Sequence, residues 1–551
     1  MKLNVNLTNH NDSLNRREEI RMKGKKILKF KGISTLLIIL AMIGLFMCFG
    51  GITATASDPN VAISISDTEP CQIWDPAEEA SDGLLVLMNI YETLLRYDAL
   101  EKKIIPVLAT GYTKSDDGMS WTFFIRRGVR FHDGSELDAE AVKFSIERTK
   151  RIGKGVAFIW DSVNKITVVD KYTVKFDLDY PAPVDLISTS AYAAYIVSKK
   201  AVQSHGEDWL NQGNAVGTGP YLLQKSKMGE EAILRAFDGY WKGWKKDRKR
   251  YDFVVFKKIM ESSAKRQMIE KGDATVAYYL PPGDLDQLKS NHNVNVHVGP
   301  ALENLLLMLN TQKAPLNNKL VRQALAYAFP YEKVVKYAAS GYAVQSRGPF
   351  PANLWGHSKT LFQYSQDLNK AKQLLKQANF SQNGQKLLFT YQSAVEAQKK
   401  MAEMYKSDLA KIGVEMELRG MPFESMWELA KSTKIEDRQD LTALVWWPSY
   451  CDPYDWAYTM FHTQDYISFN IAYWENAKFD QTIDQANEVS VLDQKKSIAI
   501  YHQAQEIMID ESPALFVYDK QTTVVTHRSF KGYKNNPAYS KVIFYHEVYP
   551  E

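Results

Sequence analysis

The chain has 551 residues, too many for one hydrophobic core, so we expect roughly two to four domains. A hydrophobic fraction of 45% and a charged fraction of 24% are ordinary for globular proteins and name no function. The first 56 residues hold nine of the 68 Lys and Arg residues and three of the 64 Asp and Glu residues, which leaves 59 basic and 61 acidic residues in the remainder. This near-neutral balance gives no support to nucleic-acid binding, and we expect no nucleic-acid partner.

The N-terminus predicts export from the cytoplasm. Five lysines between residues 23 and 31 precede a mostly apolar run over residues 33–52, and Ala54 and Ala56 form a small-residue cleavage pattern. A run of twenty such residues is also long enough to span a bilayer, so this segment is either an export signal or an N-terminal membrane anchor. In both cases we expect the rest of the chain in the periplasm or at the outer face of the cytoplasmic membrane.

Two details of this leader stay open. Cleavage after Ala56, lipidation at Cys48 and retention as an anchor all fit the sequence. Translation could begin at Met1 or at Met22, because Met22 opens a more typical signal peptide.

The region from 108 to 180 predicts a small, largely antiparallel module. The stretch "YTVKFDL", residues 172–178, alternates apolar and polar side chains, as in a strand that is buried on one face. Two Asp-Gly pairs, at 117–118 and 133–134, are hairpin signals, because glycine readily adopts the positive φ that tight turns require.

The second half of the chain alternates helices and strands. The stretch "LVRQALAYA", residues 320–328, has apolar residues at helical spacing and ends before Pro330. Farther on, the pattern predicts helix 368–378, strand 386–391, helix 394–412, strand 414–420, helix 424–432 and strand 441–447. Repeated winding of this kind predicts an α/β domain with a largely parallel sheet. No repeat or flexible linker is found, so we expect domains joined by short crossovers and strand continuations, as in a hinge.

Several ordered motifs point to one family. They are "WDPAEEASDGLLVLMNIYETLLRYD" (74–98), the stretch 104–148, "GTGPYLL" (217–223), "DGYWKG" (238–243), "VRQALAYAFPYEKVVKYAASGYA" (321–343) and "YHQAQEIMIDESPALFVY" (501–518). In this combination the chain resembles the extracellular solute-binding proteins of family 5, the binding components of ABC importers for dipeptides, oligopeptides, nickel chelates and some oligosaccharides. The resemblance covers nearly all of residues 57–551.

The resemblance implies an α/β fold of the type II periplasmic-binding-protein kind, in which two lobes with an additional inserted domain surround a ligand cleft. Domain I would be split over residues 57–92, 197–295 and 512–551, domain II would be the inserted domain at 93–196, and domain III would cover 296–511.

The stretch "WWPSYCDPYDW", residues 446–456, is the main candidate for a functional site. As an acid–base pair, Asp452 and Asp455 would suit a secreted hydrolase. An Asp-Pro pair, however, more often begins a helix, where the Asp carboxylate accepts hydrogen bonds from backbone N–H groups. The sequence holds no C-x-x-C, H-x-H, H-E-x-x-H or G-x-S-x-G pattern. We therefore expect no metal site, no cofactor and no enzyme activity.

A ligand platform suits the stretch better. Strand 441–447 ends there, and open α/β sheets bind ligands outside the carboxyl ends of their strands. Aromatic rings at such a point can stack on a sugar face, an aromatic group or a peptide plane. Strand alternation puts Trp447 on the buried face, so we predict Trp446 as the ring in the cleft. The candidate ligand residues of the stretch are Trp446, Trp447, Ser449, Tyr450 and Cys451.

Ser449 departs from the family. Peptide-binding members carry a Gly-Trp followed, a few residues on, by an Asp that pairs with the α-ammonium group of the ligand. When Trp446 is aligned with that Trp, Ser449 takes the place of the Asp. An uncharged hydroxyl cannot offset the desolvation of an ammonium group as a carboxylate does. This argues against a standard dipeptide ligand, unless Asp452 or a one-residue gap restores the charge.

By the same resemblance, further candidates for the cleft are Cys71, Tyr192, Tyr195, Arg347 and Trp355. Arg347 could hold a carboxylate bidentately or be a solvated surface side chain. Cys71 and Cys451 either form one bridge or stay two buried thiols. A bridge between opposite lobes would lock their closure, so we predict free thiols.

We therefore predict an exported monomer that captures a small-molecule solute or short peptide by hinge closure and delivers it to the membrane permease of an ABC transporter. The solute class stays open between peptide-like compounds, oligosaccharides and metal chelates. The alternatives are a ligand-binding protein that feeds an extracytoplasmic sensor, and a secreted hydrolase that uses Asp452 and Asp455.

Overall fold

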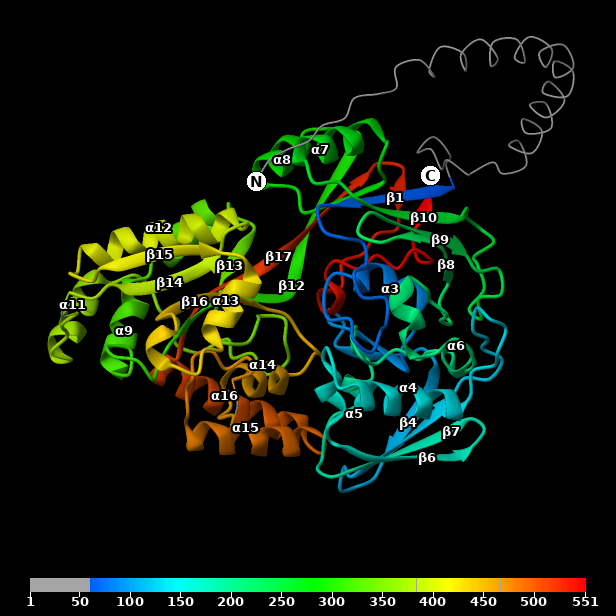
Figure 1. Ribbon diagram of the computed structural model, residues 1–551, viewed down its shortest axis with the longest axis horizontal. Coiled ribbons are helices and arrows are strands. Elements are labelled where there is room, and N and C mark those ends of the chain that lie inside the picture. Colours follow the sequence, from blue (N-terminus) through cyan, green and yellow to red (C-terminus); the bar gives the residue numbers. More distant parts are fainter. Residues whose placement is uncertain (1–59, 383, 466) are drawn as a thin grey trace, which may run out of the picture. The chain divides into compact units, whose positions relative to one another are not determined.

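An eleven-stranded sheet runs through the described part of the chain, which comprises residues 60–382, 384–465 and 467–551 of a computed structural model (Figure 1). In hydrogen-bonded order its strands are β15 (Met416–Met421), β14 (Leu387–Gln392), β16 (Leu441–Trp446), β12 (Val294–Leu309), β17 (Ala514–His527), β11 (Val276–Tyr278), β1 (Val61–Ser66), β10 (Phe253–Lys258), β9 (Glu231–Ala236) and β8 (Tyr221–Lys227), with β13 (Ala343–Gln345) paired to β17. The predicted export signal or anchor, residues 1–56, lies outside the described residues.

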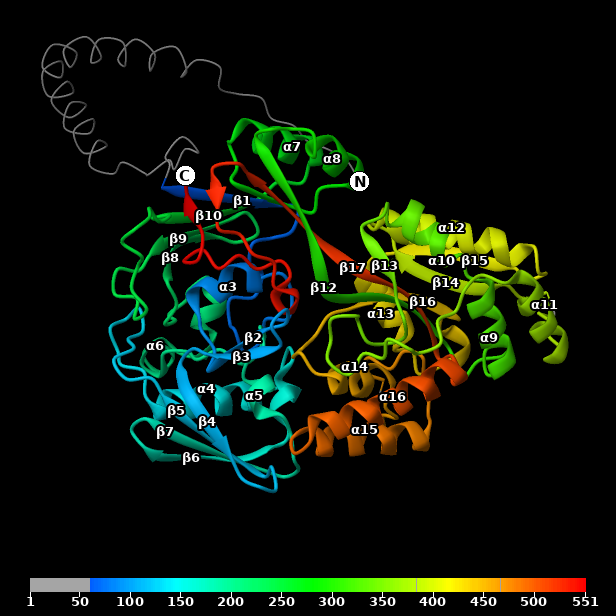
Figure 2. The same ribbon diagram turned by 180° about the vertical axis from the view of Figure 1, so that it is seen from behind.

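The long strands β12 and β17 belong to both halves of this sheet. They pair with each other in antiparallel fashion, with a shift of register between Pro300 and Asn304. Beyond that shift β12 pairs with β16, whereas the far end of β17 pairs with β11. Figures 1 and 2 show both strands passing from the elements around β14, β15 and β16, here called the second lobe, to those around β1, β8, β9 and β10, the first lobe. The predicted joining of domains by strand continuation is found here.

The second lobe has the predicted alternation of helices and strands. Strand β14 is parallel to both β15 and β16. The helices that alternate with these strands, or precede them, are α9 (Lys319–Ala328), α11 (Leu368–Gln377), α12 (Glu396–Ala410) and α13 (Phe423–Ala430). The Asn318 side chain caps α9 by accepting the N–H of Leu320, and α9 stops before Pro330, as predicted. Each predicted element between residues 320 and 447 is confirmed, with ends that differ by one or two residues.

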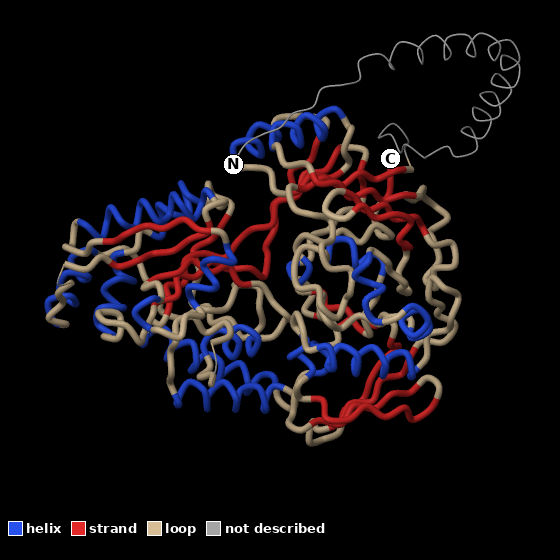
Figure 3. Tube along the Cα trace, viewed as in Figure 1, coloured by secondary structure: helices blue, strands red, loops and turns tan. Residues whose placement is uncertain are grey.

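A separate antiparallel sheet forms the predicted small module. Its strands, in order, are β4 (Ala109–Lys114), β5 (Ser120–Ile125), β7 (Thr173–Leu178) and β6 (Val163–Asp170), and helix α4 (Ala139–Ile152) lies against it (Figure 3). Gly118 has a φ of 72° in the turn between β4 and β5, which confirms that hairpin signal. Along β7 every second side chain is buried, as the alternation of the sequence predicts.

The other α-helices of the described residues are α3 (Leu84–Ile90), α5 (Val184–Ile187), α6 (Lys199–His205), α7 (Ser262–Lys271), α8 (Pro282–Leu288), α10 (Tyr331–Lys333), α14 (Pro453–Phe461), α15 (Ala477–Ser490) and α16 (Gln494–Glu511). Two short ribbons pair β2 (Leu95–Asp98) with β3 (Lys103–Pro106) and β18 (Phe530–Lys531) with β19 (Tyr549–Pro550). None of the helices in these described stretches has the length and apolar character needed to cross a membrane.

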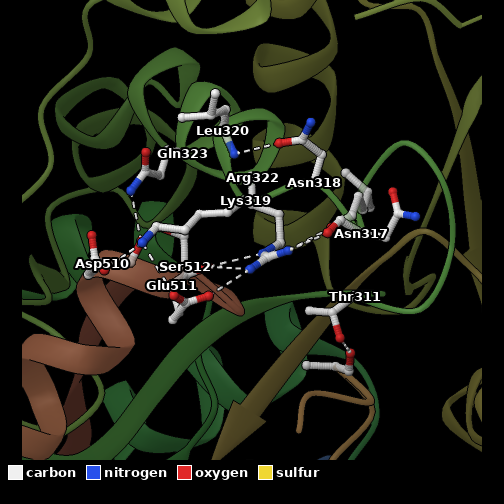
Figure 4. Close-up of polar contacts among 12 residues, drawn as sticks. Thr311, Asn317, Asn318, Lys319, Leu320, Arg322, Gln323, Asp510, Glu511 and Ser512 are labelled. Atoms are coloured by element: carbon white, nitrogen blue, oxygen red, sulfur yellow. Dashed lines mark hydrogen bonds and ion pairs between the residues drawn. The ribbon is translucent and has the colours of Figure 1, made fainter. Parts of the chain in front are cut away.

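Arg322 fixes the start of α9 to the end of α16 (Figure 4). The buried guanidinium donates to the backbone carbonyl of Glu511 at 3.0 and 2.7 Å and to that of Leu316 at 3.0 Å, and it lies 3.3 Å from the Glu511 carboxylate. Because α16 leads directly into β17, this network anchors one of the two strands that join the lobes.

The predicted domain ranges stay a prediction. The described residues belong to one compact unit, and the predicted boundary between residues 295 and 296 falls inside β12. The predicted boundary between residues 511 and 512 falls between α16 and β17.

Candidate functional site

A cavity of about 500 Å³, here called the first cavity, opens at the carboxyl end of β16. Its volume is typical of small-molecule sites, which measure roughly 300–1,000 Å³. The loop after β1 and helix α3 line it on one side, and the segment after β16 lines it on the other. The lining residues are Thr68, Glu69, Gln72, Ala80, Ser81, Asp82, Leu84, Thr189, Ser190, Ala191, Tyr192, Leu302, Glu303, Phe423, Trp447, Pro448, Ser449, Tyr450, Cys451, Pro537, Ala538, Tyr539, Ser540 and Lys541.

Residues 447–451, the platform segment, are held by hydrogen bonds to their backbone. The N–H of Ser449 donates to the Asp455 carboxylate at 2.9 Å, and the carbonyl of Ser449 accepts from the Ser190 hydroxyl at 2.5 Å. The carbonyl of Cys451 accepts from the indole N–H of Trp355 at 3.1 Å. With the backbone fixed in this way, the Trp447 ring, 43% exposed, projects from a rigid support.

The opposite wall carries charge. Lys541 Nζ lies 3.6 Å from Asp82 Oδ1 and 3.6 Å from Glu303 Oε1, and Lys520 Nζ lies 2.7 Å from Glu303 Oε2. Burial opposes the charge of Glu303, but Lys520 and Lys541 together hold its pKa at about 2. The Tyr279 hydroxyl donates to the second oxygen of Asp82 at 2.6 Å. Asp82, Glu303 and Lys541, here called the charged wall, present compensated charges of both signs to the first cavity.

Asp452 and Asp455 do not face one shared space. Asp452 lines a third cavity of about 570 Å³, and Asp455 lines a second cavity of about 480 Å³. Asp452 caps α14 by accepting the N–H of Tyr454 at 2.8 Å, which confirms the predicted capping role. Burial, followed by the nearby carboxyl of Asp455, raises the pKa of Asp452 to about 8, and burial raises the pKa of Asp455 to about 7. The two carboxyls thus line different cavities, whereas a hydrolase needs both to flank one substrate bond.

Comparison with known proteins decides the family. The sequence pattern described as "Bacterial extracellular solute-binding proteins, family 5 Middle" matches residues 103–468. The chain belongs to this family. It is 30% identical over 504 residues to a probable D,D-dipeptide-binding periplasmic protein of Escherichia coli, and this alignment covers 89% of this chain and 94% of that protein. It is 26% identical over 479 residues to the glutathione-binding protein of Salmonella typhimurium, which covers 86% of this chain and 91% of that protein.

Solved structures share the fold of this solute-binding protein. One is the ABC transporter-associated periplasmic binding protein DppA of Helicobacter pylori, in complex with the peptide STSA. It matches with a TM-score of 0.76 at 27% sequence identity, and the match covers 89% of this chain and 98% of the DppA chain. The ABC transporter substrate-binding protein CtaP of Listeria monocytogenes matches with a TM-score of 0.78 at 20% sequence identity, and the match covers 89% of this chain and 99% of the CtaP chain. The predicted family, the predicted α/β fold class and the predicted role as a substrate-binding component are confirmed.

Four of the five candidates in the aromatic stretch line the first cavity of the solute-binding protein: Trp447, Ser449, Tyr450 and Cys451. The expectation for the two tryptophans was wrong. Trp446 is only 7% exposed and packs edge-on against Phe469 with ring centroids 5.1 Å apart, whereas Trp447 is the ring that faces the cavity. Strand β16 pairs with β14 on one edge and β12 on the other, and five of its six side chains are buried. Alternation therefore carries no information about which side chain is exposed.

Of the further candidates, Tyr192 lines the first cavity, but Cys71, Tyr195, Arg347 and Trp355 do not. The Tyr195 hydroxyl donates a hydrogen bond to the carbonyl of Ala191, and the Arg347 guanidinium donates one to the carbonyl of Leu361 at 2.7 Å. Both side chains are therefore bonded to the backbone of the protein. Trp355 supports the platform segment from outside the cavity.

Cys71 and Cys451 are free and buried in this structure. The Cys71 thiol donates to the carbonyl of Ile73 at 3.1 Å. Within the described residues, no three His, Cys, Asp or Glu side chains come together as a metal site would require.

The charged wall escaped the sequence analysis. Successive members of Asp82, Glu303 and Lys541 are more than 200 residues apart, and neither Glu303 nor Lys541 stands in a recognisable pattern. Asp82 lies in the run from 74 to 98 that carries part of the family resemblance, and this is the one signal that pointed toward it.

Proposed function

We propose that this solute-binding protein captures a medium-sized solute in the first cavity by hinge closure and delivers it to the permease of an ABC importer. The observation that carries the proposal is the lining of that cavity, which comes from the loop after β1 in the first lobe and from the platform segment after β16 in the second. A solute held there touches both lobes and stabilises the closed arrangement by contacts that the open one lacks. Strands β12 and β17 supply the hinge, because they cross between the lobes.

We propose a peptide-like solute as the first choice among the three predicted classes, ahead of oligosaccharides and metal chelates. The Trp447 and Tyr450 rings suit a peptide plane, and the charged wall offers both a carboxylate and an ammonium group to the ends of a zwitterion. The relatives that match over most of their length are named for a D,D-dipeptide and for glutathione, which supports this class.

Ser449 bears on how such a solute is oriented. No residue of the platform segment carries a charge, and the carboxyl of Asp452 lines the third cavity instead of the first. We infer that an ammonium group of the solute meets Asp82 or Glu303 on the charged wall. We also propose that the protein acts outside the cytoplasm, since two of the relatives above are named as periplasmic. We propose in addition that it acts as a monomer.

Native mass spectrometry of the purified full-length protein tests the proposal. We expect a retained small molecule of unchanged covalent structure. After its removal, at least one of D-alanyl-D-alanine, glutathione, the peptide STSA and nickel–L-histidine should raise the melting temperature. A probe at 100 times its Kd stabilises the folded state by about 2.7 kcal/mol.

Two results would count against this function. One is the absence of both a retained solute and any stabilisation by the four probes. The other is turnover of a probe that disappears in Asp455→Asn, which would favour the hydrolase.

A further inference from the structure

The second cavity, of about 480 Å³, has no part in the function proposed above. It lies between the segment from 158 to 187, which begins in the 3-10 helix η1 (Ala157–Trp160), and the helices α14 and α15. Tyr450 lines both this cavity and the first one, so the two are neighbours with a common wall.

Exposed aromatic rings gather at the second cavity. Phe158, Tyr180 and Tyr458 all line it, and each is at least 36% exposed. The rings of Tyr454 and Tyr458 stack with centroids 5.0 Å apart at 27°. Large rings left in water forgo a burial gain, and their faces attract cations. The gathering of three such rings around one space indicates a bound group that covers them.

The charge of the lining is negative. Asp161, Asp455, Asp484 and Glu488 line the second cavity, and no Lys or Arg of the described residues does. His462 is the one basic side chain in the lining, and its Nε2 lies 3.4 Å from Asp484 Oδ2. Even with His462 protonated and with Asp455, whose pKa is about 7, neutral, the three other carboxyl groups outnumber it. Such a lining repels anions and attracts cations.

Two amide oxygens in the same lining lack a donor. Asn487 is only 4% exposed, and none of the described residues donates a hydrogen bond to its Oδ1. The buried Oε1 of Gln464 is likewise without a donor among the described residues. A buried acceptor with no partner keeps its desolvation penalty, so both positions favour a ligand with N–H groups.

We propose that the second cavity binds an organic cation with N–H donors, namely a protonated primary amine or a guanidinium group on a short carbon chain. Its charge would face Asp484 and Glu488, its carbon chain would lie against the rings of Tyr180 and Tyr458, and its N–H groups would reach Asn487. A quaternary ammonium ion has no hydrogen to give to the two amide oxygens. A metal ion does not suit the site, because the described residues provide no group of three ligands for one.

Isothermal titration calorimetry on the full-length protein at low salt tests this site. The probes are 1,4-diaminobutane, its neutral analogue 1,4-butanediol, and tetramethylammonium, which is a cation without N–H groups. We expect the diamine to bind at least about tenfold more tightly than either of the other probes. Equal affinity for the diamine and the diol would overturn the proposal, and so would equal affinity for the diamine and tetramethylammonium.

Matched variants locate the binding. Asp484→Asn and Tyr458→Leu should each weaken diamine binding by about tenfold. Glu475→Gln also neutralises a carboxylate and Tyr337→Leu also replaces a tyrosine ring, both at exposed positions outside the cavity, and they should leave binding unchanged. If Asp484→Asn lowers the melting temperature of the protein alone, Glu488→Gln at its more exposed position replaces it. Equal losses in test and control variants would overturn the proposal. Loss of diamine binding in Trp447→Ala would assign the amine to the first cavity and overturn it as well.

Discussion

The hydroxyl of Ser190 donates a 2.5 Å hydrogen bond to the backbone carbonyl of Ser449, and both residues are buried. The same hydroxyl accepts the N–H of Tyr192 at 3.0 Å. One side chain thus joins the 189–192 segment to the platform segment at the first cavity. A carbonyl that loses its donor in such a place keeps its desolvation penalty, so this contact determines part of the stability of the site.

Ser190→Ala should lower the free energy of unfolding by about 1–3 kcal/mol. Urea denaturation followed by tryptophan fluorescence measures the change. Ser393→Ala removes a hydroxyl from an exposed position and serves as the control, with an expected change within about 0.5 kcal/mol. Equal stabilities of the Ser190 variant and the unmodified protein would show that water replaces the lost donor.

Substitutions of the two neighbouring tryptophans should affect different properties, solute binding for Trp447 and stability for Trp446. Trp447→Ala is expected to weaken binding of the retained solute at least about tenfold and to change the free energy of unfolding by less than about 1 kcal/mol. Trp446→Ala empties a buried site and should lower that free energy by about 3–5 kcal/mol. Melting curves with and without the solute report both quantities. The reverse pattern, with binding lost in the Trp446 variant alone, would restore the assignment expected from strand alternation.

This pair also shows where sequence reasoning succeeds and fails. The pattern of residues 320–447 predicted each helix and strand there, because local spacing of apolar side chains determines those elements. It also located the platform segment at the end of β16. It could not decide between Trp446 and Trp447, because β16 is flanked by β14 and β12 and has few exposed positions, so the choice depends on where the strand ends.

The charged wall was beyond sequence reasoning for a different reason. Glu303 lies next to the register shift of β12, whereas Asp82 and Lys541 come from opposite ends of the chain. Only the tertiary fold brings the Lys541 ammonium group to 3.6 Å from an oxygen of each carboxylate. Local spacing in a sequence does not predict a contact between residues so far apart in the chain.

Asp452 should make stability depend on pH. Its pKa in the folded protein is about 8, above the usual value for Asp, so the folded state binds the proton more strongly than the unfolded state. This contribution to stability is fully present below about pH 4 and is lost as pH rises to about 8. The carboxyls of Asp455 and Asp185 and the ring of Tyr501 face the same group.

Asp452→Asn keeps a helix-capping side chain but cannot ionise. Relative to the unmodified protein, it should gain up to about 1.4 kcal/mol of stability per pH unit between pH 5 and 8. Urea denaturation at four pH values measures this slope. Asp367→Asn changes an exposed cap of the same kind on α11 and serves as the control. A flat difference for Asp452→Asn would mean that Asp452 is ionised in the folded protein.

Both buried cysteines should react slowly in the folded protein. Burial raises the pKa of the Cys71 thiol and, together with Asp455 and Asp452, that of Cys451, so neither forms the reactive thiolate at pH 8. Iodoacetamide without reductant should therefore label both residues only after denaturation, as peptide mapping will show. A denatured sample in which neither is labelled would reveal a disulfide and contradict the prediction of free thiols.

Arg322 should be more important for stability than its neighbours on α9. Arg322→Leu removes the donors to the carbonyls of Leu316 and Glu511 and leaves the Glu511 carboxylate without its buried partner. We expect a loss of about 3 kcal/mol in the free energy of unfolding. Gln323→Ala removes one hydrogen bond to the carbonyl of Asp510 at the surface and should lower that free energy by less than about 1 kcal/mol. Equal losses in the two variants would mean that the contact of α9 with α16, and not the buried guanidinium, anchors the start of β17.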